Sequence, residues 1–308
     1  MRWIGGQGEG PGEYRSVAGV SVLPDGLLAV WDRTLGRVLL YGHRGRYFDH
    51  IQTRIRAPNV ERAFVTGAPN EYYIKVFTVV PGFGQSTGDA RGEYGFVRVG
   101  RDGSVLDTLF VPGDYDIESA STVAVWTRGG YRSPFPIRVL SALSPMGYYI
   151  AGTNVDYTFA IYHPQGAVTV KRDEARVKVS PAERDEWEAR VRWSESTFGQ
   201  AWATVPEWKP AYRDLWVDAD GRIWVERYMP AVRDSAFGLG GMREDEPEIT
   251  WSEPLVLDVY SHNGEFMWCV SLPSYADVLA SRGLVVWGVV RDRLGRETIV
   301  RWRLRRTV

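Results

Sequence analysis

The chain has little of several residue types that commonly carry chemistry. Of its 308 residues only one, Cys269, is cysteine, and four are histidine. A single cysteine forms neither a disulfide within the chain nor a cysteine-based zinc site. Because Cys269 lies in an apolar strand pattern, we expect an inert, buried thiol. The HExxH pattern of zinc proteases is missing, and we nominate no catalytic residue.

Long apolar runs and excess charge are missing too. No run of about 18 apolar residues occurs, so we expect no membrane span. The net charge is −1, which gives no reason to expect nucleic-acid binding; an RNA-binding protein of this size would need a basic face. No signal-peptide pattern opens the chain. The hydrophobic content of 44% is sufficient for a large core, and we expect a monomer.

Short apolar runs bounded by turn residues recur along the chain. One unit predicts strands at 19–23, 27–31, 37–41 and 47–51, and another at 139–143, 148–150, 157–162 and 167–170. In both units the glycines of the first and third turns are 19 residues apart, at 26 and 45 and at 147 and 166. Two further units carry insertions, at 60–65, 72–76, 95–99 and 105–111, and at 215–217, 223–225, 255–260 and 266–270. A last unit has three strands, at 276–279, 284–290 and 298–304.

These repeats predict an all-β chain, a β-propeller of four-stranded antiparallel blades with five blades readable. The segment Arg2–Ile4 would supply the fourth strand of the last blade, so that an N-terminal strand closes the ring. We expect one domain over residues 1–308. Two insertions depart from the pattern: a short helix at about 181–193, capped by Ser180 with Glu183 three residues later, and a long mobile loop at about 231–253.

The opening residues carry a recognisable signature. Gly8–Tyr14 reads GEGPGEY, and it is followed by Pro24-Asp25-Gly26, by a strand ending in Asp32, and by Arg37-Val38. This pattern resembles the bacterial six-bladed β-propeller family related to NHL-repeat and TolB-like propellers. The resemblance implies six blades and an exported, periplasmic or secreted protein. Because five blades are readable here, we expect either a five-bladed ring or a chain without its first blade.

Aromatic side chains give the strongest functional indication. The chain has 13 Trp, 16 Tyr and 11 Phe, and several lie in loops beside arginine. Aromatic faces combined with arginine suit sugars, peptides or aromatic ligands. Packing within the propeller is the alternative role of these side chains. The candidate ligand-binding residues, taken from one loop and from strands near the funnel, are Arg128, Tyr131, Arg132, Phe135, Tyr157, Arg213, Trp216, Trp224 and Arg227.

Three other groups of residues give weaker indications of function. The glycine-rich segment 5–12 lacks the following helix of a phosphate cradle, which favours an interblade turn. His43, His163 and His262 precede equivalent third-turn glycines of different blades, so we expect them to lie far apart and to share no metal. The acidic run 114–118 offers carboxylates for Ca²⁺ but lacks an EF-hand pattern, so a solvated loop is favoured. We therefore predict no cofactor, no metal site and no catalytic residue.

Together these features favour a non-enzymatic propeller that binds a small molecule, a glycan or a protein. The alternative is a propeller hydrolase or lyase with a carboxylate or metal site in the central channel. Propellers host both kinds of function, so the fold alone does not choose between them.

Overall fold

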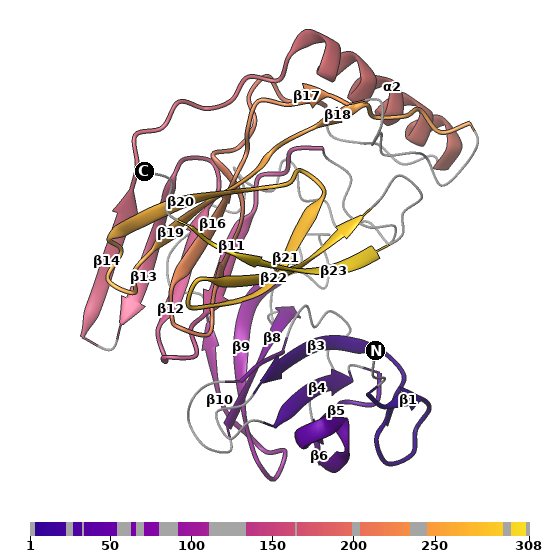
Figure 1. The fold of residues 1–308 in the computed structure, drawn as a ribbon, viewed down its shortest axis with the longest axis vertical. Coiled ribbons are helices and arrows are strands. Elements are labelled where there is room, and N and C mark those ends of the chain that lie inside the picture. The colour runs from indigo at the N-terminus through magenta and orange to yellow at the C-terminus, as the bar shows by residue number, and fades with distance from the viewer. Residues whose placement is uncertain are drawn as a thin grey trace, which may run out of the picture. The chain divides into compact units, whose positions relative to one another are not determined.

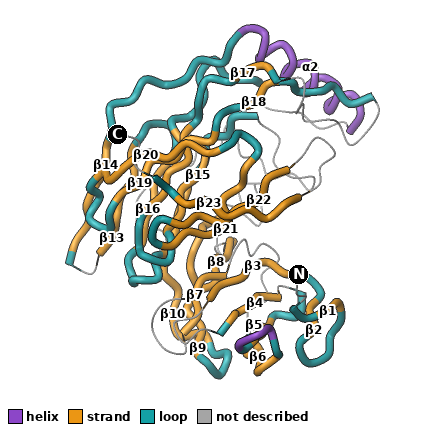
Figure 2. The backbone as a smooth tube through the Cα atoms, viewed as in Figure 1, coloured by secondary structure: helices purple, strands orange, loops and turns teal. Residues whose placement is uncertain are grey.

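The computed structural model describes residues 4–22, 27–32, 34–53, 63–65, 71–79, 92–110, 134–163, 165–198, 204–234, 245–291 and 297–305. Antiparallel sheets make up nearly all of this, and α2 (Pro181–Phe198) is the one α-helix among these residues (Figures 1 and 2). Five sheets follow one another along the chain with their strands in sequential, meander order. They are the blades of a β-propeller, as the repeats predict.

The strands of the first two blades match the predicted runs to within a few residues. Blade 1 contains β3 (Val17–Val22), β4 (Leu28–Asp32), β5 (Arg37–Tyr41) and β6 (Tyr47–Gln52), with the short 3₁₀ turn η1 (His43–Gly45) before β6. Blade 2 contains β7 (Ala63–Val65), β8 (Glu71–Val79), β9 (Gly92–Gly100) and β10 (Val105–Phe110). In front of blade 1, β1 (Gly6–Gln7) pairs in parallel with β2 (Glu13–Tyr14).

The other three blades follow the same plan. Blade 3 contains β11 (Val139–Leu143), β12 (Tyr149–Thr153), β13 (Thr158–His163) and β14 (Gly166–Lys171). Blade 4 contains β15 (Tyr212–Val217), β16 (Ile223–Arg227), β19 (Leu255–Tyr260) and β20 (Phe266–Leu272). Blade 5 contains β21 (Ala276–Arg282), β22 (Val285–Arg291) and β23 (Glu297–Arg303).

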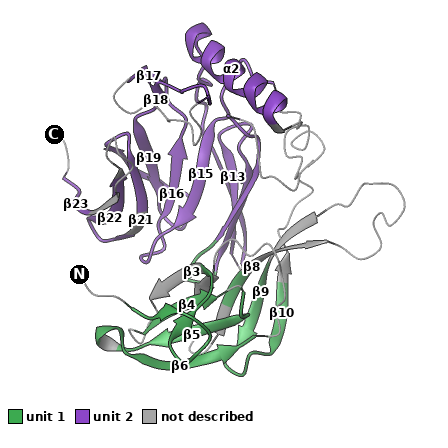
Figure 3. Ribbon diagram, turned by 90° about the vertical axis from the view of Figure 1, so that its right-hand side faces the viewer, with its two compact units in different colours: residues 1–113, 143–147 green, residues 114–142, 148–308 purple. Residues whose placement is uncertain are grey.

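The chain divides into two compact units, coloured separately in Figure 3. Unit 1 comprises residues 1–113 and 143–147 and contains blades 1 and 2. Unit 2 comprises residues 114–142 and 148–308 and contains blades 4 and 5 and the strands β12–β14 of blade 3. Arg2 and Trp3, the centre of the predicted closing strand, lie outside the described residues. Closure of the ring by that strand stays a prediction.

Blades pack face to face through alternate residues of their strands. In β5, Val38 and Leu40 join a core shared with Ile74 of blade 2, whereas Leu39 and Tyr41 point to the opposite face, where Ile4 packs against their cluster. Such alternation follows from the two-residue period of a strand. It explains why every residue of β5 is buried, since both faces of the blade are covered.

Both predicted insertions are present, with differences. The helix α2 begins after Ser180, whose hydroxyl accepts a hydrogen bond from the Glu183 backbone N–H (3.2 Å), and it continues to Phe198, beyond the predicted end. Residues 231–253 are not a loop throughout. Within them β17 (Val232–Arg233) pairs with β18 (Trp251–Ser252), and the two strands run beside α2 in Figure 1. The prediction missed this pair because two residues are too few to show a strand period.

Candidate functional site

Three connections of blades 3 and 4, two of them long, leave from the same end of their strands. Residues 154–157 join β12 to β13, residues 172–211 lead through α2 to blade 4, and residues 228–254 join β16 to β19. Loops at one edge of a rigid scaffold are where binding residues usually gather. The candidate site lies at this edge, within unit 2.

Its centre is Asp258, a fully buried residue of β19. Along this strand Leu257 and Val259 face the core shared with blade 5, whereas Tyr260 belongs to the core shared with blade 3. Asp258 is two residues before Tyr260 and therefore points to the same side of the strand, so its carboxylate faces blade 3. A charged side chain in such an apolar strand requires partners that offset the loss of hydration.

Blade 3 and the neighbouring strand β16 supply these partners. The Tyr157 hydroxyl and Nη1 of Arg172 each donate to Asp258 Oδ2 at 2.8 Å, and Arg227 Nε lies 3.7 Å away. The Tyr260 hydroxyl donates to that of Tyr157 at 3.0 Å. Burial, and then the charge of Asp258, raise the pKa of Tyr157, so this phenol stays protonated and remains a donor.

Glu174 completes the cluster. It follows β14 and forms ion pairs with Arg172, where Oε2 lies 2.9 Å from Nε, and with Nη2 of Arg227. Two arginines and two carboxylates thus alternate around the junction of blades 3 and 4. We call Tyr157, Arg172, Glu174, Arg227 and Asp258 the Asp258 cluster.

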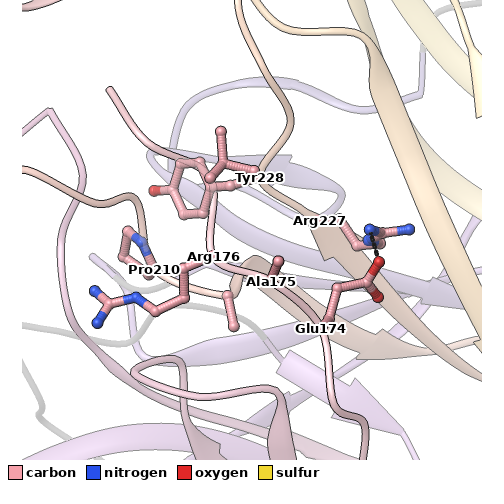
Figure 4. Close-up of a pocket in the computed structure, with 8 residues that line it drawn as sticks. Glu174, Ala175, Arg176, Pro210, Arg227 and Tyr228 are labelled. Carbon is pink, nitrogen blue, oxygen red and sulfur yellow. Dashed lines mark hydrogen bonds and ion pairs between the residues drawn. The ribbon is translucent and has the colours of Figure 1, made fainter. Parts of the chain in front are cut away.

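A small hollow adjoins the Asp258 cluster, and its volume of about 10 Å³ is room for about one water molecule. Figure 4 shows the ion-paired side chains of Glu174 and Arg227 on one side and those of Tyr228 and Pro210 on the other. Ala175, Val177 and Ala211 complete an apolar lining. The hollow therefore combines a charged wall with an apolar floor.

A second charged network lies beneath α2. The ammonium group of Lys209 is fully buried, 2.7 Å from Glu183 Oε1 and 3.1 Å from Glu253 Oε1. Arg213 pairs with Glu253 and Glu226 at 3.0 Å each. Its guanidinium lies over the ring of Tyr228, 4.7 Å from the centroid. This network fixes the helix and the residue 228–254 connection to blade 4.

The predicted ligand residues separate into several groups. Tyr157 and Arg227 meet in the Asp258 cluster, and Arg213 belongs to the network beneath α2. Phe135 is buried against Tyr228 and against Trp187 of α2. Arg128, Tyr131 and Arg132 lie outside the residues that the structure describes.

Trp216 and Trp224 lie on the other face of blade 4. Their rings stack at 6.2 Å in the core shared with blade 5, and Trp224 donates its indole N–H to Asp218 at 2.8 Å. These two aromatic rings stabilise the packing of blades and do not line the hollow.

Sequence reasoning missed Arg172, Glu174 and Asp258. The available signal was the single charge of Asp258 within the apolar run 255–260, since a buried charge marks a site that needs partners. Arg172 and Glu174 occupy a connection without strand periodicity and carried no such signal.

Two expectations about scarce residues were wrong. Cys269 is exposed rather than buried, because β20 is the outer strand of its blade. Partial burial and the neighbouring Asp258 nevertheless raise the pKa of its thiol. His163 and His262 are not far apart: a ring nitrogen of His163 lies 2.9 Å from the His262 backbone oxygen, because equivalent turns of adjacent blades are neighbours.

The glycine-rich segment forms a turn, as expected. Its Gly10 N–H donates to the chain's own Glu13 carboxylate at 2.8 Å, and the Arg37 guanidinium donates to the carbonyl oxygens of Gly10 and Glu13. Asp32 accepts hydrogen bonds from the backbone N–H groups of Arg15, at 2.8 Å, and of Ser16. The signature residues therefore hold the first blade and its preceding turn together.

Comparisons with known proteins add little about function. No family model and no curated protein matches the chain. Among solved structures, a DUF4221-family member from Bacteroides vulgatus has a TM-score of 0.49 at 9% identity, covering 98% of this chain and 82% of its own. A Bacteroides fragilis protein named as exported has a TM-score of 0.43 at 10% identity, with 93% and 70% covered. Virginiamycin B lyase from Staphylococcus aureus has a TM-score of 0.35 at 10% identity, with 94% and 85% covered. TM-scores this low carry no argument about activity.

The described ranges contain no helix that is both long and apolar enough to cross a membrane. Nor do they bring three or more His, Cys, Asp or Glu side chains together in a way that suits a metal ion.

Proposed function

We propose that the protein is a non-enzymatic β-propeller that binds a ligand or a polypeptide segment on the surface beside the Asp258 cluster, around the hollow. The observation that carries this proposal is the arrangement of Arg227 and Glu174. Both line the hollow, and both are held in place from behind by Asp258 or Arg172. Polar groups held in this way lose little conformational freedom when a ligand binds, which favours affinity.

The same contacts favour binding over catalysis. A general base must reach a proton of the substrate. Asp258 is fully buried and shares Oδ2 between Tyr157 and Arg172, whereas Glu226 and Glu253 are both engaged by Arg213. These carboxylates orient arginine side chains, which is a role in recognition.

The proposal includes a place among known propellers. The signature of residues 8–38 supports membership of the six-bladed group related to NHL-repeat and TolB-like propellers, and with it export to the periplasm or the medium. The structural roles of Asp32 and Arg37 support that assignment, because both hold the turn in which the signature lies.

A thermal-shift screen with neutral sugars, short peptides and divalent cations tests the proposal. We expect at least one sugar or peptide to raise the melting temperature of the wild type, since a ligand that binds only the folded state stabilises it. The shift should be lost in Arg227→Ala and kept in Arg98→Ala, which removes an arginine paired with Asp107 in unit 1. Stoichiometric metal with turnover of a substrate would instead support the hydrolase or lyase alternative.

A further inference from the structure

The arginines of blade 5 differ from other arginines of unit 2. Arg282, Arg301 and Arg303 are exposed, and none of them forms an ion pair within the described part of the chain. Elsewhere in unit 2 several arginines are paired with a carboxylate, among them Arg172, Arg190, Arg213, Arg222 and Arg227. A guanidinium group without a counter-ion is available to an external carboxylate, which it can bind through two parallel N–H donors.

The three arginines share one face of the blade. Trp302 of β23 packs on the core shared by blades 4 and 5, so its neighbours Arg301 and Arg303 point to the other face of the sheet. On that face Arg303 is opposite Val285 of β22, and Val285 is opposite Arg282 of β21. Arg303, Val285 and Arg282 therefore form one row across the blade, with an arginine at each end.

Apolar side chains lie between these arginines. Val285 is half-buried in the middle of the first row. In the next row the half-buried Trp287 is opposite Arg301, whose guanidinium carbon lies over the indole ring, 6.0 Å from the centroid. The face thus presents three cations around a small apolar strip. We call Arg282, Val285, Trp287, Arg301 and Arg303 the blade 5 face.

The spacing of the cations favours an extended polypeptide as the ligand. Arg301 and Arg303 are two residues apart on one strand, so their Cα atoms are separated by about 6.6 Å. An extended peptide has a similar rise per residue, and its alternate side chains point the same way. Carboxylates on every second residue of such a peptide therefore match the two arginines one to one. Arg282 lies two strands from Arg303, about 9.6 Å away, and can bind a further carboxylate.

Charge and the position of Arg301 narrow the class further. Asp277, one row beyond Trp287, brings one negative charge to a face with three positive ones, so an anionic ligand is attracted. Because Arg301 already lies over Trp287, little of the ring surface is left for a nucleobase or a sugar ring to stack on. Such stacking contributes much of the affinity for single-stranded nucleic acids. An acidic peptide needs only the guanidinium groups and the apolar strip.

From these features we infer that the blade 5 face binds an acidic polypeptide segment in an extended conformation, with carboxylates on alternate residues paired with Arg301 and Arg303. This is a second binding surface, since none of its residues belongs to the Asp258 cluster, and the inference does not depend on the proposed function. Single-stranded nucleic acids and sulfated glycans are the competing anions that the experiment must distinguish.

Fluorescence anisotropy on the full chain tests the inference. The probe is a short labelled peptide in which Glu and Thr alternate, and its counterpart has Gln in place of Glu. We expect the acidic peptide alone to bind, with an affinity that falls about tenfold or more between about 0.05 M and about 0.5 M NaCl, because salt screens exposed charges. A single-stranded oligonucleotide and a sulfated oligosaccharide of equal charge are the competitors.

Charge-reversal variants locate the binding. Arg303→Glu should weaken binding of the acidic peptide about tenfold or more, because it replaces an attraction by a repulsion. The matched control is Arg192→Glu, which makes the same change of net charge at an exposed arginine of α2 and should leave binding unchanged. Arg303→Lys keeps the charge and should bind within about threefold of the wild type, which guards against a mere effect on folding.

Three results would overturn the inference. The first is absence of binding by the acidic peptide at low salt. The second is equal binding by Arg303→Glu and Arg192→Glu, which would place the peptide elsewhere on the molecule. The third is tighter, Arg303-dependent binding of the oligonucleotide or the sulfated oligosaccharide, which would show that the blade 5 face takes a different class of anion.

Discussion

The buried ammonium group of Lys209 supports a sharp stability prediction. Its Nζ is fully buried between Glu183 and Glu253, donates to the Met229 carbonyl oxygen at 3.3 Å, and lies 4.9 Å from the centroid of the Phe135 ring. The substitution Lys209→Met keeps most of the aliphatic stem and removes the charge. We expect it to lower the free energy of unfolding by about 3–5 kcal/mol, because removing one partner of a buried ion pair leaves an uncompensated charge.

The two carboxylates would respond differently. Glu253 keeps Arg213 at 3.0 Å and the Met229 backbone N–H at 2.8 Å, whereas Lys209 is the only cation paired with Glu183 within the described residues. Burial already raises the pKa of Glu183. In the variant the pKa rises further, so the folded state takes up a proton more readily than the unfolded state. The loss of stability should therefore be smaller at pH 5 than at pH 8.

Urea unfolding followed by tryptophan fluorescence at both pH values measures this loss. The matched control is Lys178→Met, which breaks an exposed pair with Glu207 and should cost no more than about 1 kcal/mol. The double variant Lys209→Met with Glu183→Gln should recover part of the loss, since it removes the stranded charge. If Lys209→Met and Lys178→Met cost the same, the reasoning about the buried network is refuted.

Three further predictions concern blade packing, alkaline pH and ring closure. Gly264→Ala should lower the free energy of unfolding by about 1–3 kcal/mol more than Gly147→Ala does. Both glycines have a positive φ, but only at Gly264 would a Cβ approach a neighbour, Val170, at 2.7 Å. Equal losses in the two variants would contradict this prediction. Because the pKa of Tyr157 is raised in the folded state, the free energy of unfolding should be constant below the unfolded tyrosine pKa of about 10 and should fall above it. Tyr157→Phe should make this fall less steep by about 1.4 kcal/mol per pH unit. An unchanged pH dependence would refute the buried position of the Tyr157 hydroxyl beside Asp258. Deleting residues 1–6 should cost about 2 kcal/mol or more, because it removes Ile4 from the cluster of Val30, Leu39 and Tyr41. Unchanged stability in urea would argue against a closing strand.

Strand parity explains how much of the site the sequence could predict. Along β16, Ile223, Val225 and Arg227 share the face toward blade 3, and Trp224 has the opposite face. The alternation of apolar residues contains that information, so Arg227 and Trp224 could have been assigned to different sites. Grouping candidates by residue type placed them in one site instead.

The rest of the site depends on contacts between distant segments. Arg172 and Asp258 are 86 residues apart, and Lys209 and Glu253 are 44 apart. Connections without periodicity carry Arg172, Lys209 and Glu253 to their partners. Local pattern predicts which residues are strands and which face they share, but the path of a connection depends on what it packs against. The short pair β17–β18 was missed for the same reason, since its stability comes from α2 through contacts such as Thr250 with Glu186.

The third-turn glycines connect the repeat to the predicted closure. A Cβ at Gly103 of blade 2 would collide with the carbonyl oxygen of Gln52, at the end of the outer strand of blade 1. A Cβ at Gly264 of blade 4 would meet Val170 in the outer strand of blade 3. At the equivalent Gly45 of blade 1, the neighbour at 2.8 Å is Ile4. Ile4 thus has the position against blade 1 that an outer strand has against the next blade, and this is the contact that a closing N-terminal strand requires.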